Sequence, residues 1–92
     1  MSYSTLRLCS GGGAFEVIPS PKLNLDLSGL APRLRESGIP VIDARVMLIL
    51  QMDPEVTVSR DGRILIKSQQ PAVARSVFAR LQDLLGLPTI QE

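Results

Sequence analysis

The chain has 92 residues and a formal net charge of +1, with 45% hydrophobic and 21% charged residues, a composition typical of one folded domain spanning residues 1–92. Ten basic residues against nine acidic ones give no broad positive surface for nucleic acid or for an anionic membrane. The longest apolar run, Val46–Leu50, is too short to cross a bilayer, and no apolar leader opens the chain, so we expect a cytoplasmic protein.

The N-terminal segment, residues 1–13, predicts a short additional strand followed by a glycine-rich turn. The strand would lie at Thr5–Leu8 and the turn at Gly11–Gly13. Phe15–Ile18 predicts the next strand, which Pro19 and Pro21 end.

A short helix is predicted over residues 28–37, where apolar residues recur at the spacing of one helix face. Asp26 or Ser28 would cap its N-terminus, and Gly38 would end it. Pro32 removes one backbone donor and keeps the helix short. The apolar stripe consists of Leu27, Leu30, Ala31 and Leu34.

The segment from Val41 to Met52 predicts the longest strand, which we place at the centre of the sheet. Every second residue is apolar, as expected for a strand with one face on the core. This predicted core row consists of Ile42, Ala44, Val46, Leu48, Leu50 and Met52. Asp53 and Pro54 then turn the chain.

Residues 55–67 predict a hairpin whose loop length follows from the phase of its apolar residues. If Asp61 and Gly62 alone formed the loop, the apolar rows of the two strands would point to opposite faces of the sheet. A three-residue loop that includes Arg60 puts both rows on one face, with Gly62 in a left-handed position. The predicted pairs are Val58 with Ile64, Val56 with Ile66 and Glu55 with Lys67.

The last helix is predicted to begin at Pro71 and to end at Gly86, which leaves residues 87–92 as a tail. Its buried stripe consists of Ala74, Val77, Phe78, Leu81, Leu84 and Leu85. The resulting order is β-α-β-β-β-α. It predicts an α+β, two-layer fold with a mostly antiparallel sheet of four strands, or five with the N-terminal one, and both helices on one face.

The chain carries no recognisable catalytic apparatus, so we expect no enzyme, no cofactor and no metal. Histidine is absent, which removes the usual general base and the commonest transition-metal ligand. Cys9 has no second cysteine or histidine to activate it, and we interpret it as an inert thiol. The run Ser10–Gly13 lacks the lysine and hydroxyl residues of a phosphate-binding loop.

Two candidate binding surfaces remain. Met47, Ile49 and Leu65 would lie on the sheet face opposite the helices, where a solvated strand should be polar. If they are contiguous, they indicate a surface for a protein partner or for a second copy of the chain, whereas scattered apolar side chains are normal. The alternative is a basic edge for nucleic acid, although the chain offers no aromatic stacking platform on the sheet. Its residues would be Arg45, Arg60, Arg63 and Lys67.

Two stretches carry a family resemblance: Val56–Lys67, with its Asp-Gly-Arg turn, and Pro71–Arg80, with its Ala-Arg spacing. Over about residues 8–86 the chain resembles the C-terminal domain of ThiF/MoeB-type adenylyltransferases, which activate ubiquitin-like sulfur carriers. The resemblance implies a free-standing accessory domain that works beside an activating enzyme or its ubiquitin-like carrier.

The chain also departs from that family. Ser59 and Arg60 stand where the family tends to have Phe-Pro, and Gln70 stands where it has Asp. The nucleotide-binding domain, with its glycine fingerprint and paired zinc cysteines, has no counterpart in the sequence. No functional residue of the enzymes is therefore carried over, and the resemblance does not imply adenylation.

Overall fold

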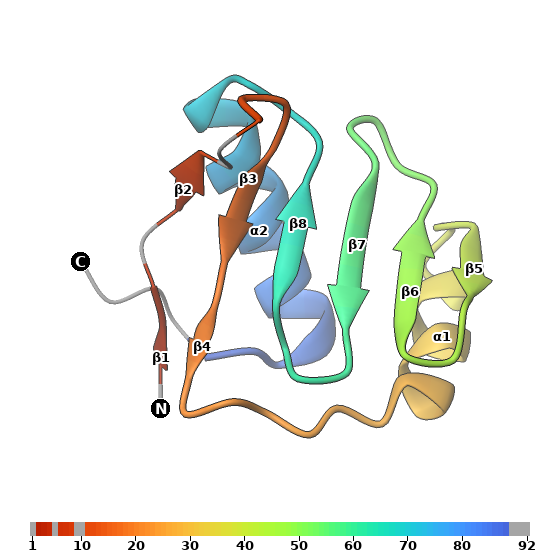
Figure 1. Ribbon diagram of the computed structural model, residues 1–92. Coiled ribbons are helices and arrows are strands. Elements are labelled where there is room, and N and C mark those ends of the chain that lie inside the picture. Colours follow the sequence, from red (N-terminus) through yellow and green to blue (C-terminus); the bar gives the residue numbers. More distant parts are fainter. Residues whose placement is uncertain (1, 5, 9–10, 89–92) are drawn as a thin grey trace.

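A computed structural model describes residues 2–4, 6–8 and 11–88 of the chain. Two helices, α1 (Leu27–Glu36) and α2 (Pro71–Leu85), both lie behind one face of an antiparallel sheet (Figure 1). The predicted α+β, two-layer architecture is confirmed. The sheet has more strands than expected, and a separate two-stranded ribbon joins the N-terminal end to the segment before α1.

The main sheet has six strands, all antiparallel, in the order β2-β3-β8-β7-β6-β5. In that order their bounds are Arg7–Leu8, Phe15–Val17, Ile64–Ile66, Val56–Ser59, Met47–Leu50 and Val41–Asp43. The ribbon pairs β1 (Ser2–Tyr3) with β4 (Pro19–Ser20). Part of the predicted N-terminal strand exists as β2, whereas Thr5 lies outside the described residues.

The hairpin of β7 and β8 has the predicted three-residue loop. The N–H of Gly62 donates to the carbonyl of Ser59 at 2.9 Å, and the N–H of Ser59 donates to the carbonyl of Arg63 at 2.9 Å. Gly62 has a φ of +93°. The observed pairs include Val58 with Ile64 and Val56 with Ile66, and all four side chains are buried on one face as expected.

The prediction of one strand from Val41 to Met52 is wrong. The chain reverses at Ala44–Val46, where Arg45 has a φ of +71°, and forms two strands, β5 and β6, at one side of the sheet instead of a central strand. Ile42 pairs with Ile49, so the two side chains lie on the same face of the sheet. The turn therefore puts the even-numbered residues of β5 on the face opposite the even-numbered residues of β6. Of the predicted core row, Leu48 and Leu50 are buried and Met52 is half-buried, but Ile42, Ala44 and Val46 are exposed.

Both helices follow the predicted signals. Asp26 caps α1 by accepting from the N–H of Gly29 at 3.3 Å. Pro71 opens α2, and Gly86 ends it in a left-handed conformation. The buried residues of the two helices, which pack on the sheet, are Leu27, Ala31, Leu34, Ala74, Phe78, Leu81 and Leu85.

The connection between β4 and α1 runs along the lower end of the sheet in Figure 1, against the turn of the β7–β8 hairpin. Leu23 and Leu25 donate their N–H groups to the carbonyls of Asp61 and Arg60, each at 2.8 Å. The hydroxyl of buried Tyr3 donates to the carbonyl of Gly62 at 2.7 Å. These contacts bring two distant parts of the chain to the hairpin turns.

Candidate functional site

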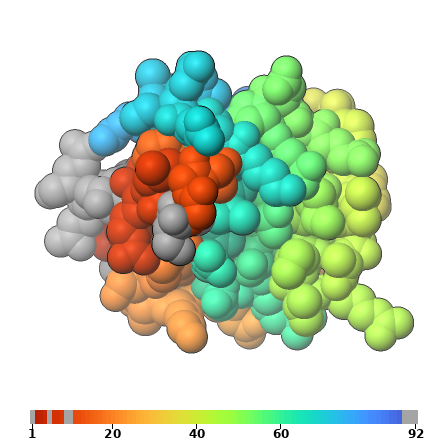
Figure 2. Space-filling view, turned by 45° about the horizontal axis from the view of Figure 1, so that its top comes forward, coloured from red at the N-terminus to blue at the C-terminus, as the bar shows by residue number. Residues whose placement is uncertain are grey.

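The outer face, which we define as the sheet surface opposite the helices, carries one row of side chains in register across all six strands. From β5 to β2 this row consists of Ile42, Ile49, Thr57, Leu65, Glu16 and Arg7. Figure 2 shows this side of the molecule as a surface of strand segments, with α2 visible only at its margin. The row is apolar over β5 and β6 and charged over β2 and β3.

The register puts the three predicted partner-binding residues on the outer face. Ile49 and Leu65 flank Thr57 in the row, and Met47 lies two residues from Ile49 on the same strand. All three are half-buried. Ile42 extends the apolar part of the row to the edge strand and is 47% exposed.

Sequence reasoning missed Ile42 and Val46, which it assigned to the core. Val46 is 58% exposed and lies in the β5–β6 turn, next to Met47. Two signals could have revealed the turn. A twelve-residue strand exceeds the usual three to ten residues. Asp43 also accepts a hydrogen bond from the N–H of Arg45 at 2.8 Å, the local bond by which aspartate favours turns.

The charged end of the row is held together by Glu16. Its carboxylate accepts from Arg63 Nη2 at 2.6 Å and Nε at 2.9 Å, and from Arg7 Nη2 at 3.1 Å. The hydrogen bonds from Arg63 lower the pKa of Glu16, desolvation partly opposes them, and the hydrogen bond from Arg7 lowers the pKa further. This cluster is therefore an anion between two cations at neutral pH.

The basic edge proposed for nucleic acid does not assemble. Arg63 pairs with Glu16, and Lys67 pairs with Glu55 at 3.1 Å, the cross-strand pair expected for this hairpin. Arg45 and Arg60 lie instead at the two hairpin turns, where Arg60 Nη2 donates to the carbonyl of Arg45 at 3.3 Å. The four cations thus divide into a neutralised pair on the outer face and a pair at the turns.

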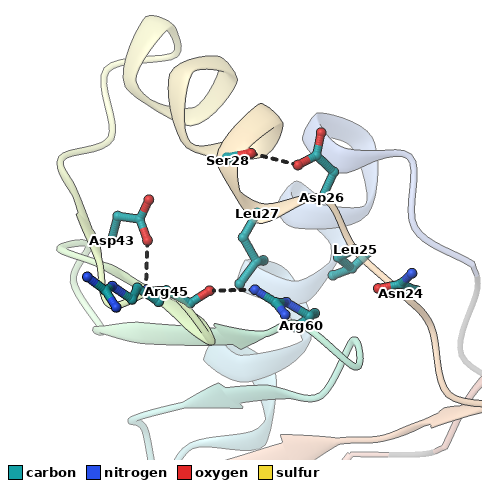
Figure 3. A pocket seen from close by; sticks show the side chains of 8 residues that line it. All are labelled: Asn24, Leu25, Asp26, Leu27, Ser28, Asp43, Arg45 and Arg60. Atoms are coloured by element: carbon teal, nitrogen blue, oxygen red, sulfur yellow. Dashed lines mark hydrogen bonds between the residues drawn. The ribbon is translucent and has the colours of Figure 1, made fainter.

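Two hollows lie at the turn end of the sheet, which we define as the end that carries the β5–β6 and β7–β8 turns. One, of about 580 Å³, lies between the first turn of α1 and the hairpin turns; Figure 3 labels its lining residues, which include Asp26, Asp43, Arg45 and Arg60. The second, of about 530 Å³, shares Arg60 with the first and extends to Val46 and Met47. Sequence reasoning named Arg45 and Arg60 only as part of a basic edge and predicted no groove here, because the hollows form only when the connection before α1 docks on the turns.

The described part of the chain contains no group of three or more histidine, cysteine, aspartate or glutamate side chains that could hold a metal ion. No helix within residues 11–88 is long and apolar enough to cross a membrane. Cys9, interpreted from sequence as inert, lies outside the described residues.

In comparisons with known proteins, no family model, no curated protein and no solved structure matched the chain. The resemblance to the accessory domain of ThiF/MoeB-type enzymes therefore stays a prediction from the sequence.

Proposed function

We propose that this protein is a non-catalytic protein-binding module that uses the outer face of its sheet, and that the occupant of this face is a second copy of the chain. One observation carries the proposal. Ile42, Ile49 and Leu65 lie in one register row on a face that no helix of the described chain covers.

The composition of this row favours burial. An antiparallel sheet with one solvated face normally carries polar side chains there. Each large aliphatic side chain gains roughly 1.5–3 kcal/mol when it passes from full exposure to full burial. Ile42 is 47% exposed and Ile49 and Leu65 are half-buried, so each has part of this gain still available. A partner surface that covers these three side chains would provide the rest of this stabilisation.

The pattern of the row favours a second copy as the occupant. A two-fold axis along the row would set each residue against its own counterpart, which is the geometry of an isologous dimer. Ile49 would then meet Ile49, and Leu65 would meet Leu65. At the charged end the same axis would set Glu16 against Glu16 and Arg7 against Arg7. Because Glu16 lies between Arg7 and Arg63, each carboxylate would also have guanidinium groups beside it, which offset these like-charge contacts.

Charge and size are also compatible with self-association. A net charge of +1 gives two copies little mutual repulsion. The sheet lies across the broad side of a molecule whose Cα extents are 29 × 27 × 21 Å. The area of that side is similar to the ~800 Å² of surface that each partner buries in a standard interface. A partner therefore has to cover most of the outer face.

Pairing through the free edge of β5 is less favourable than pairing through the face. The N–H of Gln51 donates to the carbonyl of Pro40, and the N–H of Ala44 donates to that of Met47, so the backbone of Val41 points away from β6. Arg35 Nη2 donates to the outward carbonyl of Val41 at 3.0 Å. A side chain from α1 therefore occupies the edge that an added strand would need.

The role beside an activating enzyme or its ubiquitin-like carrier rests on the sequence resemblance. It gives a separate expectation about chemistry. The purified protein should show no ATP–pyrophosphate exchange with a ubiquitin-like carrier, because the chain has no nucleotide-binding motif. Exchange that depends on this chain alone would overturn the non-catalytic assignment.

Light scattering tests the self-association. We expect the wild-type protein to scatter as a dimer at concentrations up to ~1 mM, where even weak pairing is populated. The double variant Ile49→Glu/Leu65→Glu should scatter as a monomer, because it buries two carboxylates against their own copies. Circular dichroism checks that the variant is folded.

Ser76→Glu/Ala79→Glu is the matched control. It adds the same two charges at exposed positions of α2, on the other side of the molecule, and should remain dimeric. A wild-type protein that stays monomeric over the whole concentration range contradicts the proposal. So does a folded Ile49→Glu/Leu65→Glu variant that is still a dimer.

A further inference from the structure

We infer that the turn end of the sheet is a second binding site, which takes an extended peptide through a carboxylate held by Arg60. The inference rests on the two hollows and their hydrogen bonds, and the groove shares only Met47 with the three residues predicted for the outer face. Asn24 and Arg60 line both hollows, so the two form one groove with Arg60 at its middle.

The hydrogen bonds of the groove leave most donors of its arginines unused. Asp26 accepts from Gly29 N and Ser28 Oγ. Asp43 accepts from the N–H of Arg45 at 2.8 Å. These acids are thus partly satisfied by their own segments of chain.

Asp61, which lines the second hollow, likewise accepts from the N–H of Arg63 at 3.1 Å. The cations are less engaged. Within the described part of the chain, the guanidinium of Arg60 makes one hydrogen bond, a long one of 3.3 Å to the carbonyl of Arg45. Among the described residues, neither Arg45 nor Arg60 forms an ion pair. Since a guanidinium has five N–H donors, Arg60 keeps most of its capacity for an acceptor from outside the chain.

The walls of the groove indicate what surrounds that acceptor. Figure 3 shows Leu27 directed toward Arg60, with Leu25 to one side. Beyond Arg60, the second hollow is lined by Leu23, Val46 and Met47. An aliphatic side chain fits on each side of the guanidinium, and this spacing suits a carboxylate between two apolar residues.

A peptide fits this groove better than a nucleotide. The groove as a whole is lined by two arginines and three aspartates, so its lining carries one more negative than positive charge, which disfavours a multiply charged phosphate more than a singly charged carboxylate. None of the lining residues is aromatic, so a base has no stacking partner. The amide of Asn24 can donate to and accept from the backbone of a peptide that lies along the groove.

A carboxylate can come from an internal acidic residue or from a chain terminus, and two probes separate these sources. The first is the capped pentapeptide acetyl-Ala-Leu-Glu-Leu-Ala-amide, and the second is acetyl-Ala-Leu-Leu with a free C-terminus. Each is titrated into the ¹⁵N-labelled protein and followed by amide chemical shifts. We expect saturable shifts around Asn24, Val46 and Arg60 with one of the two.

The neutral counterpart of the binding probe, with Gln for Glu or an amidated terminus, should bind ~10–100-fold more weakly, as expected for a lost charged hydrogen bond. Arg60→Gln should weaken the charged probe by a similar factor. Arg80→Gln, at an exposed position of α2, should not. If neither probe gives saturable shifts, or if the charged and neutral probes bind equally, the inference is wrong.

This test fails independently of the one for the outer face. Ile49→Glu/Leu65→Glu should leave the probe affinity unchanged, because neither residue lines the groove. Arg60→Gln should leave the scattering mass unchanged. Probe binding that survives Arg60→Gln at full strength would place the contact elsewhere and overturn the inference.

Discussion

The turns of the β5–β6 and β7–β8 hairpins lie side by side at one end of the sheet, and each reverses the chain with one residue at positive φ. In the first this residue is Arg45, with a φ of +71°, and in the second it is Gly62, with a φ of +93°. Arg45 is exposed, whereas Gly62 is buried. The left-handed conformation that each turn requires is thus adopted by an arginine in the β5–β6 turn and by a glycine in the β7–β8 turn.

The difference follows from what lies above each turn. A Cβ at Gly62 would come within 2.9 Å of Leu23 Cδ1 and Pro19 Cγ. The Tyr3 hydroxyl also binds the carbonyl of Gly62. The β7–β8 turn is therefore part of the core, and only the residue without a side chain fits. The β5–β6 turn is held by its neighbour, because the N–H of Arg60 donates to the carbonyl of Val46 at 3.0 Å.

The largest effect is expected at Gly62. Gly62→Ala should lower the free energy of unfolding by about 2–4 kcal/mol, since it combines a left-handed backbone with overpacking. Urea unfolding measures the loss. Gly38→Ala is the matched control, because Gly38 has a φ of +85° but no atom within 4 Å of its Cβ position. Equal losses for the two variants would show that packing over the β7–β8 turn contributes nothing.

Alkaline pH should weaken the β7–β8 turn from the side of Tyr3. Burial, and then the negative charge of Asp61, raise the pKa of Tyr3 to about 12. An unfolded tyrosine has a pKa near ~10, so this contribution is complete below pH ~10 and is lost as the pH rises toward ~12. The loss should be about 2–3 kcal/mol, at ~1.4 kcal/mol per pKa unit.

The chain has one tyrosine, so its ionisation can be followed directly by tyrosinate absorbance alongside unfolding. Tyr3→Phe serves as the control and should remove the Tyr3 part of the alkaline decline. If the wild type and this variant lose stability in parallel above pH ~10, the buried phenol is not its cause.

At neutral pH, Tyr3→Phe tests the hydroxyl by itself. The variant keeps the ring, whose centroid lies 5.1 Å from that of Phe78 in an edge-to-face contact, and removes only the donor to Gly62. A buried carbonyl that loses its partner costs about 1–2 kcal/mol. Thermal unfolding at neutral pH measures this cost, and an unchanged midpoint would mean that the hydrogen bond does not stabilise the turn.

The sequence predicted the β7–β8 hairpin and missed the β5–β6 hairpin, because a glycine marks the first turn and none marks the second. In β7–β8 the glycine marks the loop, and the apolar phase of the strands fixes its length. In β5–β6 no glycine, proline or asparagine marks the turn, and alternating apolar residues run through it from Ile42 to Leu50. Periodicity alone cannot show that the chain has reversed.

The candidate sites divide in the same way. Alternation within one strand was enough to put Met47 and Ile49 on a common face, and the hairpin phase added Leu65. Ile42 joins that face only through the missed turn. The groove at Arg60 depends on the docking of residues 21–26 against the hairpin turns, a tertiary contact that no local pattern encodes.

The smallest effect is expected at Arg45, where the comparison between the turns is sharpest. Arg45 carries a Cβ at a φ of +71°, which costs ~1–2 kcal/mol for most residues. Glycine would remove that cost, but the greater conformational entropy of the unfolded glycine variant would offset part of the gain in stability. Arg45→Gly should therefore raise the free energy of unfolding by ~0.5–1 kcal/mol, because the hydrogen bond from Arg60 uses the backbone carbonyl of Arg45 and survives the change.

Arg45→Ala keeps the Cβ and should give no gain, so the difference between the two variants in urea unfolding isolates the cost of a Cβ in the left-handed backbone conformation. A destabilised Arg45→Gly protein would mean that the β5–β6 turn is held by the arginine side chain, and that the two turns differ in more than the space available for a Cβ.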